Sequence, residues 1–232
     1  MVGTYPWSGG ATLYREGKAA LNYIPNMDSP PPAGFAYARQ FCEENVFKLC
    51  ESLLEMGADL ERDDINVIFV SSLGKATPIW YQRAGKGDVV AWDYHVICQF
   101  AGDIFDLDTV LPFPTPITEY AELALQPQIS LAAEHSQRFR VLPARDYIKL
   151  FASDRSHMAA AVASGQCAEP AWGAIRGAEA LSAHTLPLFW DVSVLGGEGQ
   201  EGSGMGVVMD RDGFFKWAET KCAEEEEEEE ED

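Results

Sequence analysis

The chain has little positive charge. Its 232 residues include 17 Lys and Arg against 37 Asp and Glu, which gives a formal net charge of -20 at pH 7. Residues 224–232 are all acidic, and removing them leaves 28 acidic against 17 basic residues. We find no basic cluster in the remainder. Because a phosphate backbone is bound by clustered Lys and Arg, this composition argues against a nucleic-acid-binding protein.

Paired cysteines, long apolar runs and nucleotide motifs are also lacking. The five cysteines show no close pairing, so we expect free thiols in a reducing compartment and neither a disulfide framework nor a zinc knuckle. No apolar run reaches membrane-spanning length and no secretory signal precedes the domain, which predicts a soluble protein. His-x-x-His, Cys-x-x-Cys and the glycine-rich phosphate motifs are missing, so no metal ion or nucleotide cofactor is predicted.

What is present is the composition of a globular protein, with 47% hydrophobic and 11% aromatic residues. The length suits one domain. We predict a poorly ordered leader over residues 1–35, a single folded domain over 36–222 that is partly flexible between 159 and 206, and a disordered acidic tail over 223–232, where like charges repel one another.

The clearest helical pattern covers residues 39–56. Val46, Cys50 and Leu53 fall on one stripe, and Gly57 is a suitable C-terminal stop. Cys42 lies at the start of this helix, where the partial positive charge of unsatisfied N–H groups favours the thiolate. Cys42 is therefore a candidate nucleophile.

Strands are predicted after this helix, at residues 65–70, 78–82, 89–100 and 104–108. The last two runs are three residues apart and predict a hairpin. Shorter elements should follow: a helix around 117–125, a strand at 139–142, a helix at 144–151 and a last helix from 214.

In this hairpin Gln99 would oppose Phe105, and His95 would lie diagonal to Asp106 or beyond. Asp106 could then orient His95 as the base for a thiol packed over the strand ends. We expect Asp106 and Asp108, on either side of one leucine, to point to opposite faces, so that one of them lies at the surface or caps the next turn.

These residue types alone leave alternatives open. With five Cys, four His and many acids, some ordered Cys-His-Asp set is nearly unavoidable, and a structural cysteine and a core histidine are competing interpretations. Cys50 and Cys98 lie in apolar runs and should be inert core residues. His157 lies in a polar loop, where it lines a site or is exposed.

Longer motifs are more specific than any three residues. They occur in order along the chain at residues 41–50 (FCEENVFKLC), 78–80 (PIW), 92–96 (WDYHV), 106–114 (DLDTVLPFP) and 151–158 (FASDRSHM). Together they resemble the protein N-terminal glutamine amidohydrolase family. The resemblance is close over residues 37–158 and faint at 169–170, 204–208 and 214; residues 1–35, 159–202 and the acidic tail depart from the family pattern.

The resemblance implies an α/β fold akin to papain-like and transglutaminase-like cysteine enzymes, with a central, mostly antiparallel sheet flanked by helices. It implies conversion of a protein's N-terminal glutamine to glutamate with release of ammonia, which feeds the N-degron pathway. Cys42 would be the nucleophile, His95 the base and Asp106 the third member. A monomer without a cofactor, in the cytosol and nucleus, is implied, with proteins or peptides that begin with glutamine as partners and neither nucleic acid nor membrane.

Selection of an N-terminal residue requires an acceptor for its free α-amine. Acids within the motifs are candidates for this role, and neighbouring aromatic residues could wall the pocket, although core packing is their alternative; the acids are Glu43, Asp93 and Asp154, and the aromatic residues are Trp80, Trp92 and Tyr94. Two rival classes remain: a cysteine protease or transglutaminase-like acyl transferase, and a non-enzymatic protein whose acidic tail binds a basic partner.

Overall fold

The computed structural model describes residues 30–62, 64–85, 89–196 and 205–230, with side chains up to residue 221. Its centre is a six-stranded sheet of order β10-β7-β1-β4-β5-β6, in which every neighbouring pair is antiparallel. The strands are β1 (Asn66–Ser71), β4 (Tyr94–Phe100), β5 (Asp103–Phe105), β6 (Thr115–Pro116), β7 (Arg138–Pro143) and β10 (Val207–Met209).

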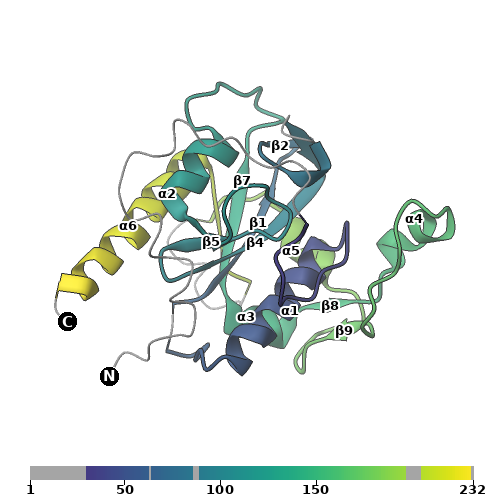
Figure 1. Ribbon diagram of the computed structural model, residues 1–232. Helices are drawn as coiled ribbons and strands as arrows, with labels where there is room; N and C mark the ends of the chain where they lie inside the picture. The colour runs from purple at the N-terminus through teal and green to yellow at the C-terminus, as the bar shows by residue number, and fades with distance from the viewer. Residues whose placement is uncertain (1–29, 63, 86–88, 197–204, 231–232) are drawn as a thin grey trace.

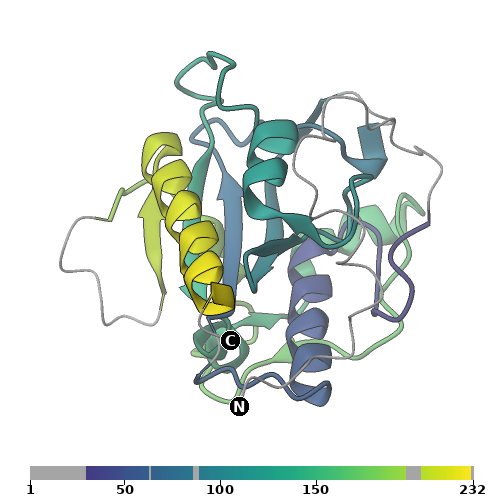
Figure 2. The same cartoon turned by 60° about the vertical axis from the view of Figure 1, so that its left-hand side comes forward.

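Helices cover both faces of this sheet (Figures 1 and 2). One face carries α1 (Cys42–Glu55), α3 (Ala144–Leu150) and α5 (Leu186–Trp190), and the other carries α2 (Ile117–Tyr120), the π-helical turn η4 (Ala121–Leu125) and α6 (Arg211–Glu230). The predicted α/β class, with a mostly antiparallel sheet between helices, is therefore confirmed.

The central strand β1 is buried along its whole length because both faces of the sheet are covered. Val67 and Phe69 belong to the core on the α1 side, whereas Ile68 and Val70 belong to the core on the α2 side. This alternation is the period-two geometry of a strand expressed in apolar residues on both sides. The strand predicted at residues 65–70 is confirmed.

The predicted helix over residues 39–56 is confirmed as α1. No side chain caps its first residue, and the acids Glu43 and Glu44 occupy its first turn. At its end Gly57 takes a φ of 104°, the Gly57 N–H donates to Leu54 O and the Ala58 N–H donates to Leu53 O. These two bonds form a Schellman turn, which satisfies carbonyls that the helix end leaves open.

The predicted hairpin exists, but its register differs by one residue. Cys98, not Gln99, pairs with Phe105, since the turn contains two residues and not three. Ala101 and Gly102 both have positive φ, as a tight two-residue hairpin turn requires. The strand predicted over 89–100 is also interrupted at Asp93, which separates β3 (Val90–Trp92) from β4, and β3 pairs with β2 (Thr77–Ile79) in a small second sheet.

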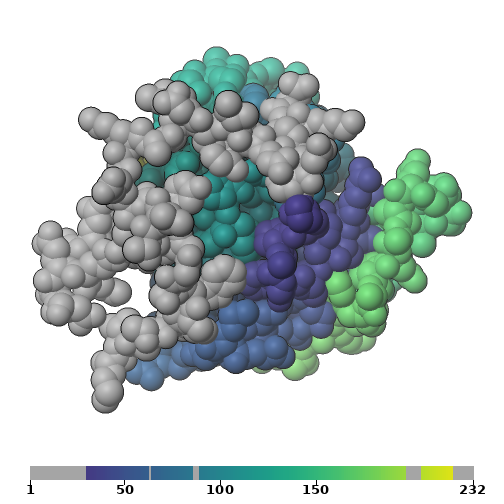
Figure 3. All heavy atoms as spheres, in the orientation of Figure 1, coloured from purple at the N-terminus to yellow at the C-terminus, as the bar shows by residue number. Residues whose placement is uncertain are grey.

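The remaining elements are short. They are η3 (Arg83–Gly85), β8 (Ala152–Ser153), η5 (Ser156–Met158), α4 (Ala159–Ala163) and β9 (Ile175–Arg176). The part of the chain around α4 projects from the body (Figure 1, and the green atoms of Figure 3). The predicted elements at 117–125, 139–142 and 144–151 correspond to α2 with η4, β7 and α3.

The last helix begins at Arg211 and its backbone continues to Glu230, through most of the acidic run for which charge repulsion predicted disorder. Glutamate has a good intrinsic helix propensity, and the first part of α6 is anchored by Phe214 and Ala218 in the core.

Residues 1–29 and 197–204 lie outside the described residues, so the leader, the predicted flexibility there and the domain limits stay predictions. None of the described helices is long and apolar enough to cross a membrane.

The Schellman turn makes a testable prediction. Gly57→Ala should lower the free energy of unfolding by about 1 to 2 kcal/mol, because an L side chain is strained at this φ. Urea denaturation measures the change. Gly173→Ala is the matched control: Gly173 lacks a left-handed φ and has open space around its Cβ position, so the variant should stay within about 0.5 kcal/mol of wild type. Equal losses in both variants would contradict this account of the turn.

Candidate active site

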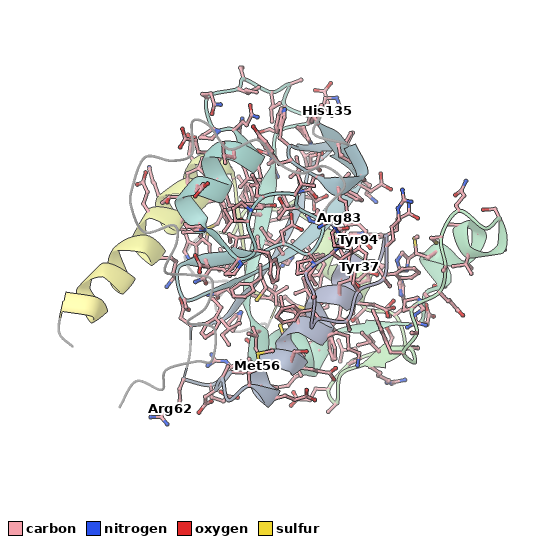
Figure 4. The ribbon with its side chains drawn as sticks, viewed as in Figure 1. Tyr37, Met56, Arg62, Arg83, Tyr94 and His135 are labelled. Carbon is pink, nitrogen blue, oxygen red and sulfur yellow. The ribbon has the colours of Figure 1, made fainter. Side chains whose placement is uncertain are left out.

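Three elements bring the predicted reactive side chains into one region. Cys42 is the first residue of α1, His95 is the second residue of β4, and Asp106 follows directly after the end of β5. Figure 4 labels Tyr37, Arg83 and Tyr94, which lie in this region of the view, near the start of α1. All three predicted residues are buried, with exposed fractions of 6%, 0% and 0% in chain order.

Asp106 is held by four hydrogen-bond donors. Its Oδ1 lies 2.9 Å from His95 Nε2 and accepts the backbone N–H of Asp108, also at 2.9 Å. Its Oδ2 accepts the Gln82 side-chain amide at 2.9 Å and the Tyr120 hydroxyl at 2.8 Å. Burial disfavours the carboxylate, but the imidazole of His95 and these donors outweigh it and lower the pKa of Asp106. Asp106 is therefore a fixed negative charge beside His95.

The contact with Asp106 gives the two ring nitrogens of His95 different roles. Since a carboxylate only accepts, Nε2 carries the hydrogen, and in the neutral imidazole Nδ1 therefore has the lone pair. Nδ1 is buried and has no hydrogen-bond partner within the described part of the chain. The Trp92 ring stacks on the imidazole with centroids 5.2 Å apart. Burial opposes the charged form, but Asp106 first, then Asp108 and Glu43, raise the pKa of His95.

Cys42 is not the easily ionised thiol that its helix position predicted. Burial, the Glu43 carboxylate and then Asp108 and Asp106 raise its pKa well above the ordinary value, while the backbone N–H of Val96 acts in the opposite direction. The thiol donates to Glu43 Oε2 at 3.7 Å. The prediction of a thiolate in the resting protein is therefore wrong, because nearby carboxylates and burial outweigh the helix N-terminus.

The backbone N–H of Val96 acts on the pKa of Cys42, so the sulfur lies near the backbone of the residue that follows His95. No hydrogen bond joins Sγ directly to the His95 ring among the described residues. Contacts of this kind are often long before substrate binds and shorten in the reactive complex. The sulfur and the open Nδ1 of His95 thus belong to the same buried region.

Asp108 also belongs to the site, which corrects the prediction that Asp106 and Asp108 point to opposite faces. Both are buried, and His95, Asp106 and Asp108 each offer an atom within 4.8 Å of the others. Residues two apart share a face even in a strand, and here both follow the strand in a turn. Such a trio could hold a metal ion, but the four donors on Asp106 and the Tyr37 hydroxyl at 2.6 Å from Asp108 Oδ1 favour hydrogen-bonding roles.

Glu43 places a second carboxylate next to the sulfur. Its side chain is fully buried, and its Oε2 accepts the Tyr94 hydroxyl at 2.9 Å in addition to the thiol. Its Oε1 has no hydrogen-bond partner within the described residues, although His157 Nε2 lies 3.4 Å away without hydrogen-bond geometry. His157 stacks on His184, with ring centroids 5.4 Å apart.

The next two residues fix the start of α1. The Glu44 carboxylate is fully buried and accepts two bonds from Arg155, at 2.9 and 2.8 Å, and one from Trp172 Nε1 at 2.8 Å. The Asn45 side chain holds both backbone groups of Ala38, at 2.8 and 2.9 Å. These contacts anchor the first turn and the chain that leads into it.

The other predicted substrate-binding residues are placed differently. Trp92 covers His95, and Tyr94 reaches Glu43 and packs its ring against Trp190 at 5.1 Å. Asp93 is exposed, and its backbone carbonyl accepts the Ser71 hydroxyl. Asp154 is exposed, accepts the Ser156 N–H at 2.9 Å and lies 3.3 Å from His184. Of the three predicted acids, Glu43 is the one that contacts the sulfur.

Several site residues carried no signal in the sequence. Gln82 and Tyr120, which hold Asp106, lie in segments read only as a strand and a helix, and Tyr37 precedes the first clear pattern. Arg155 stands inside a motif but 111 residues from its partner Glu44. Their roles depend on contacts between distant segments, which neither periodicity nor spacing reports.

Fold and site together define a class: an α/β protein that buries a helix-borne thiol in the same region as a strand-borne imidazole bonded to a buried carboxylate, the side chains used by cysteine-dependent amide hydrolases and acyl transferases. A family model described as N-terminal glutamine amidase matches residues 37–218, more than half of the chain. The chain therefore belongs to the N-terminal glutamine amidase family, which confirms the resemblance.

Curated relatives named protein N-terminal glutamine amidohydrolase are similar to the chain. The relative from Drosophila ananassae is 42% identical over 136 residues, which cover 56% of this chain and 66% of the relative. The relative from Arabidopsis thaliana is 42% identical over 134 residues, which cover 53% of this chain and 61% of the relative. The matched part of the chain thus spans slightly less than two thirds of the length of these relatives.

The buried ion pair at Glu44 makes a second prediction. Arg155→Met should lower the free energy of unfolding by about 3 kcal/mol, since it leaves a buried carboxylate without its cation. Arg145→Met is the matched control because Arg145 and Glu61 form an exposed pair, and the variant should lose less than about 1 kcal/mol in the same urea titration. Similar losses in the two variants would contradict the assigned importance of the buried pair.

Proposed function

We propose that the chain hydrolyses the side-chain amide of an N-terminal glutamine, converting it to glutamate and releasing ammonia. The observation that carries this proposal is the state of His95: Nε2 is held by Asp106, while Nδ1 is buried and without a hydrogen-bond partner within the described residues, beside the segment that contacts Cys42. Membership of the family and the names of the relatives support the choice of substrate.

In the first step, His95 Nδ1 takes the proton of Cys42 and the sulfur attacks the amide carbon of the glutamine side chain. The raised pKa of Cys42 means that this proton moves when substrate is bound and is still on the sulfur in the resting protein. Backbone N–H groups at the start of α1, including that of Cys42, would bind the oxyanion. Asp106 keeps His95 in the tautomer that can accept the proton.

In the second step, the imidazolium of His95 protonates the leaving nitrogen, ammonia departs and a thioester remains on Cys42. His95 then takes a proton from water, whose oxygen attacks the thioester carbon. Collapse of this intermediate yields the glutamate side chain and returns the proton to the sulfur. Trp92 and Tyr94 would wall the pocket in which the glutamine side chain lies.

The same three side chains could serve a cysteine protease or a transglutaminase-like acyl transferase, and mass spectrometry distinguishes these outcomes. Deamidation changes an amide to an acid without a backbone cut or an added amine. A non-enzymatic role of the acidic tail would instead depend on residues 224–232 and not on Cys42. Action in the N-degron pathway, as a monomer in the cytosol and nucleus, belongs to the proposal as well.

The proposed nucleophile is tested with a peptide that begins with glutamine. Wild type should release ammonia and yield the peptide with an N-terminal glutamate, whereas Cys42→Ser should release none while its circular dichroism spectrum stays that of wild type. Cys167→Ser is the matched control, since this half-buried cysteine lies outside the site, and it should retain activity. Ammonia release by Cys42→Ser, or none by the folded wild type, would refute the proposal.

The role of Asp106 predicts a change in the pH profile. Protonated His95 cannot accept the thiol proton, so kcat/KM should fall as the pH falls through the pKa of His95, which Asp106 raises. Asp106→Asn removes this effect and leaves the opposing effect of burial, so the acidic limb should move to lower pH. The maximal rate should fall on the order of 10⁴-fold, because the tautomer is no longer fixed.

Tyr120→Phe is the control for this experiment, since it removes one hydrogen bond to Asp106 but keeps the charge. Its acidic limb should stay close to that of wild type. An unchanged limb in Asp106→Asn would show that Asp106 does not set the pKa of the catalytic base.

A further inference from the structure

A buried carboxylate next to a nucleophilic thiol requires an explanation. Glu43 Oε2 lies 3.7 Å from the Cys42 sulfur and accepts its hydrogen, which holds the thiol in the neutral form. The side chain of Glu43 is fully buried, yet its Oε1 has no hydrogen-bond partner among the described residues. A buried charge without a full set of partners is costly, so such an atom indicates a missing donor.

Negative charge predominates around the Cys42 sulfur, which also favours the binding of a cation. Glu43, Asp106 and Asp108 are all buried there, and each acts on the charge state of Cys42. The guanidinium groups nearby form their hydrogen bonds elsewhere, Arg155 with Glu44 and Arg83 with the carbonyl of Thr109, although the charge of Arg155 also interacts with Glu43 and that of Arg83 with Asp108. His157 lies 3.4 Å from Glu43 Oε1 but without hydrogen-bond geometry. The excess of negative charge around the sulfur would therefore attract one added cation.

We propose that Glu43 is the acceptor for the substrate's α-ammonium group, and that this ion pair frees the Cys42 thiol to pass its proton to His95. The inference rests on the proposed function, because a substrate with an N-terminal glutamine brings one such cation. The inference names the residue that binds the free α-ammonium group, and it explains why this binding is required before the thiol can react.

The dimensions of glutamine suit this arrangement. Its amide carbon and its α-nitrogen are four bonds apart and can separate by about 5 Å at standard bond lengths. Both oxygens of the Glu43 carboxylate share one carbon, so the unpartnered Oε1 is close to the sulfur that Oε2 contacts. One substrate can thus place its amide carbon at Cys42 and its ammonium at Oε1. Asparagine is one methylene shorter and reaches both positions less well.

Binding of the ammonium group changes the state of the thiol through charge. The new ion pair neutralises the carboxylate that holds the thiol hydrogen, so the free energy of forming the thiolate falls. The proton then moves from Sγ to His95 Nδ1, and no other bond forms or breaks in this step. A peptide with an acetylated amine brings no cation and leaves Cys42 neutral. Selection for a free N-terminus would thus operate on kcat as well as on KM.

The first test compares a glutamine-starting peptide with its N-acetylated form. Glu43→Gln keeps the side-chain shape and an acceptor for Tyr94, but it should reduce the ratio of kcat/KM for the free peptide over the acetylated one by roughly 10- to 100-fold, as loss of a hydrogen bond between charged groups does. The acetylated peptide should react at least as fast with the variant as with wild type, because no charged carboxylate then restrains the thiol.

Asp93→Asn is the matched control, since it makes the same chemical change at an exposed acid near the site, and it should keep the wild-type ratio. A Glu43→Gln variant that discriminates as wild type does would overturn the assignment. A loss of discrimination in Asp93→Asn alone would also overturn the assignment, because it would identify Asp93 as the residue that binds the α-amine.

The second test does not depend on turnover, so it separates this inference from the proposed function. The ultraviolet absorbance of the thiolate is measured in wild type from about pH 5 to about pH 7, with Cys42→Ser as the blank, in the absence and presence of norleucine amide, which has no side-chain amide and whose α-amine is still an ammonium group in this range. The ligand should increase the thiolate fraction of wild type about tenfold or more, a shift of about one pKa unit. N-acetylnorleucine amide should have no such effect.

In Glu43→Gln the thiol should titrate at lower pH without ligand, and norleucine amide should change it little. If saturating norleucine amide left the titration of wild type unchanged, the proposed effect of the ammonium group on the thiol would be rejected. His157 would then be the group that faces Glu43 Oε1. Failure of wild type to release ammonia, together with the expected titration, would reject the proposed reaction but retain the ammonium site.

Discussion

The burial of negative charge in the first turn of α1 is the constraint on which the rest of this structure depends. Glu43 and Glu44 are both fully buried, although a helix N-terminus offsets only part of the cost of removing a carboxylate from water. Glu44 is stabilised by Arg155 and Trp172, which satisfy both of its oxygens. Among the described residues, Glu43 accepts hydrogen bonds on Oε2 and none on Oε1, and this carboxylate lies next to the sulfur. Two adjacent acids thus differ in their surroundings: Glu44 anchors the helix start, whereas Glu43 contacts the Cys42 sulfur.

The groups that stabilise this turn come from widely separated parts of the chain. Tyr94 lies on β4, Tyr147 on α3 donates to the Glu43 carbonyl at 2.8 Å, and Arg155 follows β8. The same packing that covers one face of the sheet therefore holds the helix start against the strand that carries His95. Because scaffold and site share these contacts, a loss of packing around α1 would also move the Cys42 sulfur relative to His95.

Much of this framework is visible in the sequence, since helices and strands produce local patterns. The helix at 39–56, its end at Gly57 and the strand at 65–70 follow from periodicity and turn residues, and the structure agrees within a few residues. The hairpin was predicted with a register one residue out, because a two-residue and a three-residue turn look alike in composition. The observed register of β4 and β5, and the end of β5 at Phe105, determine the positions of Asp106 and Asp108.

The sequence by itself determined the order of the reactive residue types, the family and the local elements that carry Cys42 and His95, because these depend on motifs and on short-range periodicity. Only the tertiary structure decided the charge state of the thiol, the four donors around Asp106 and the unpartnered oxygen of Glu43. A helix start favours a thiolate when considered alone. Burial and three neighbouring carboxylates reverse that preference, and these depend on how segments distant in the chain pack together.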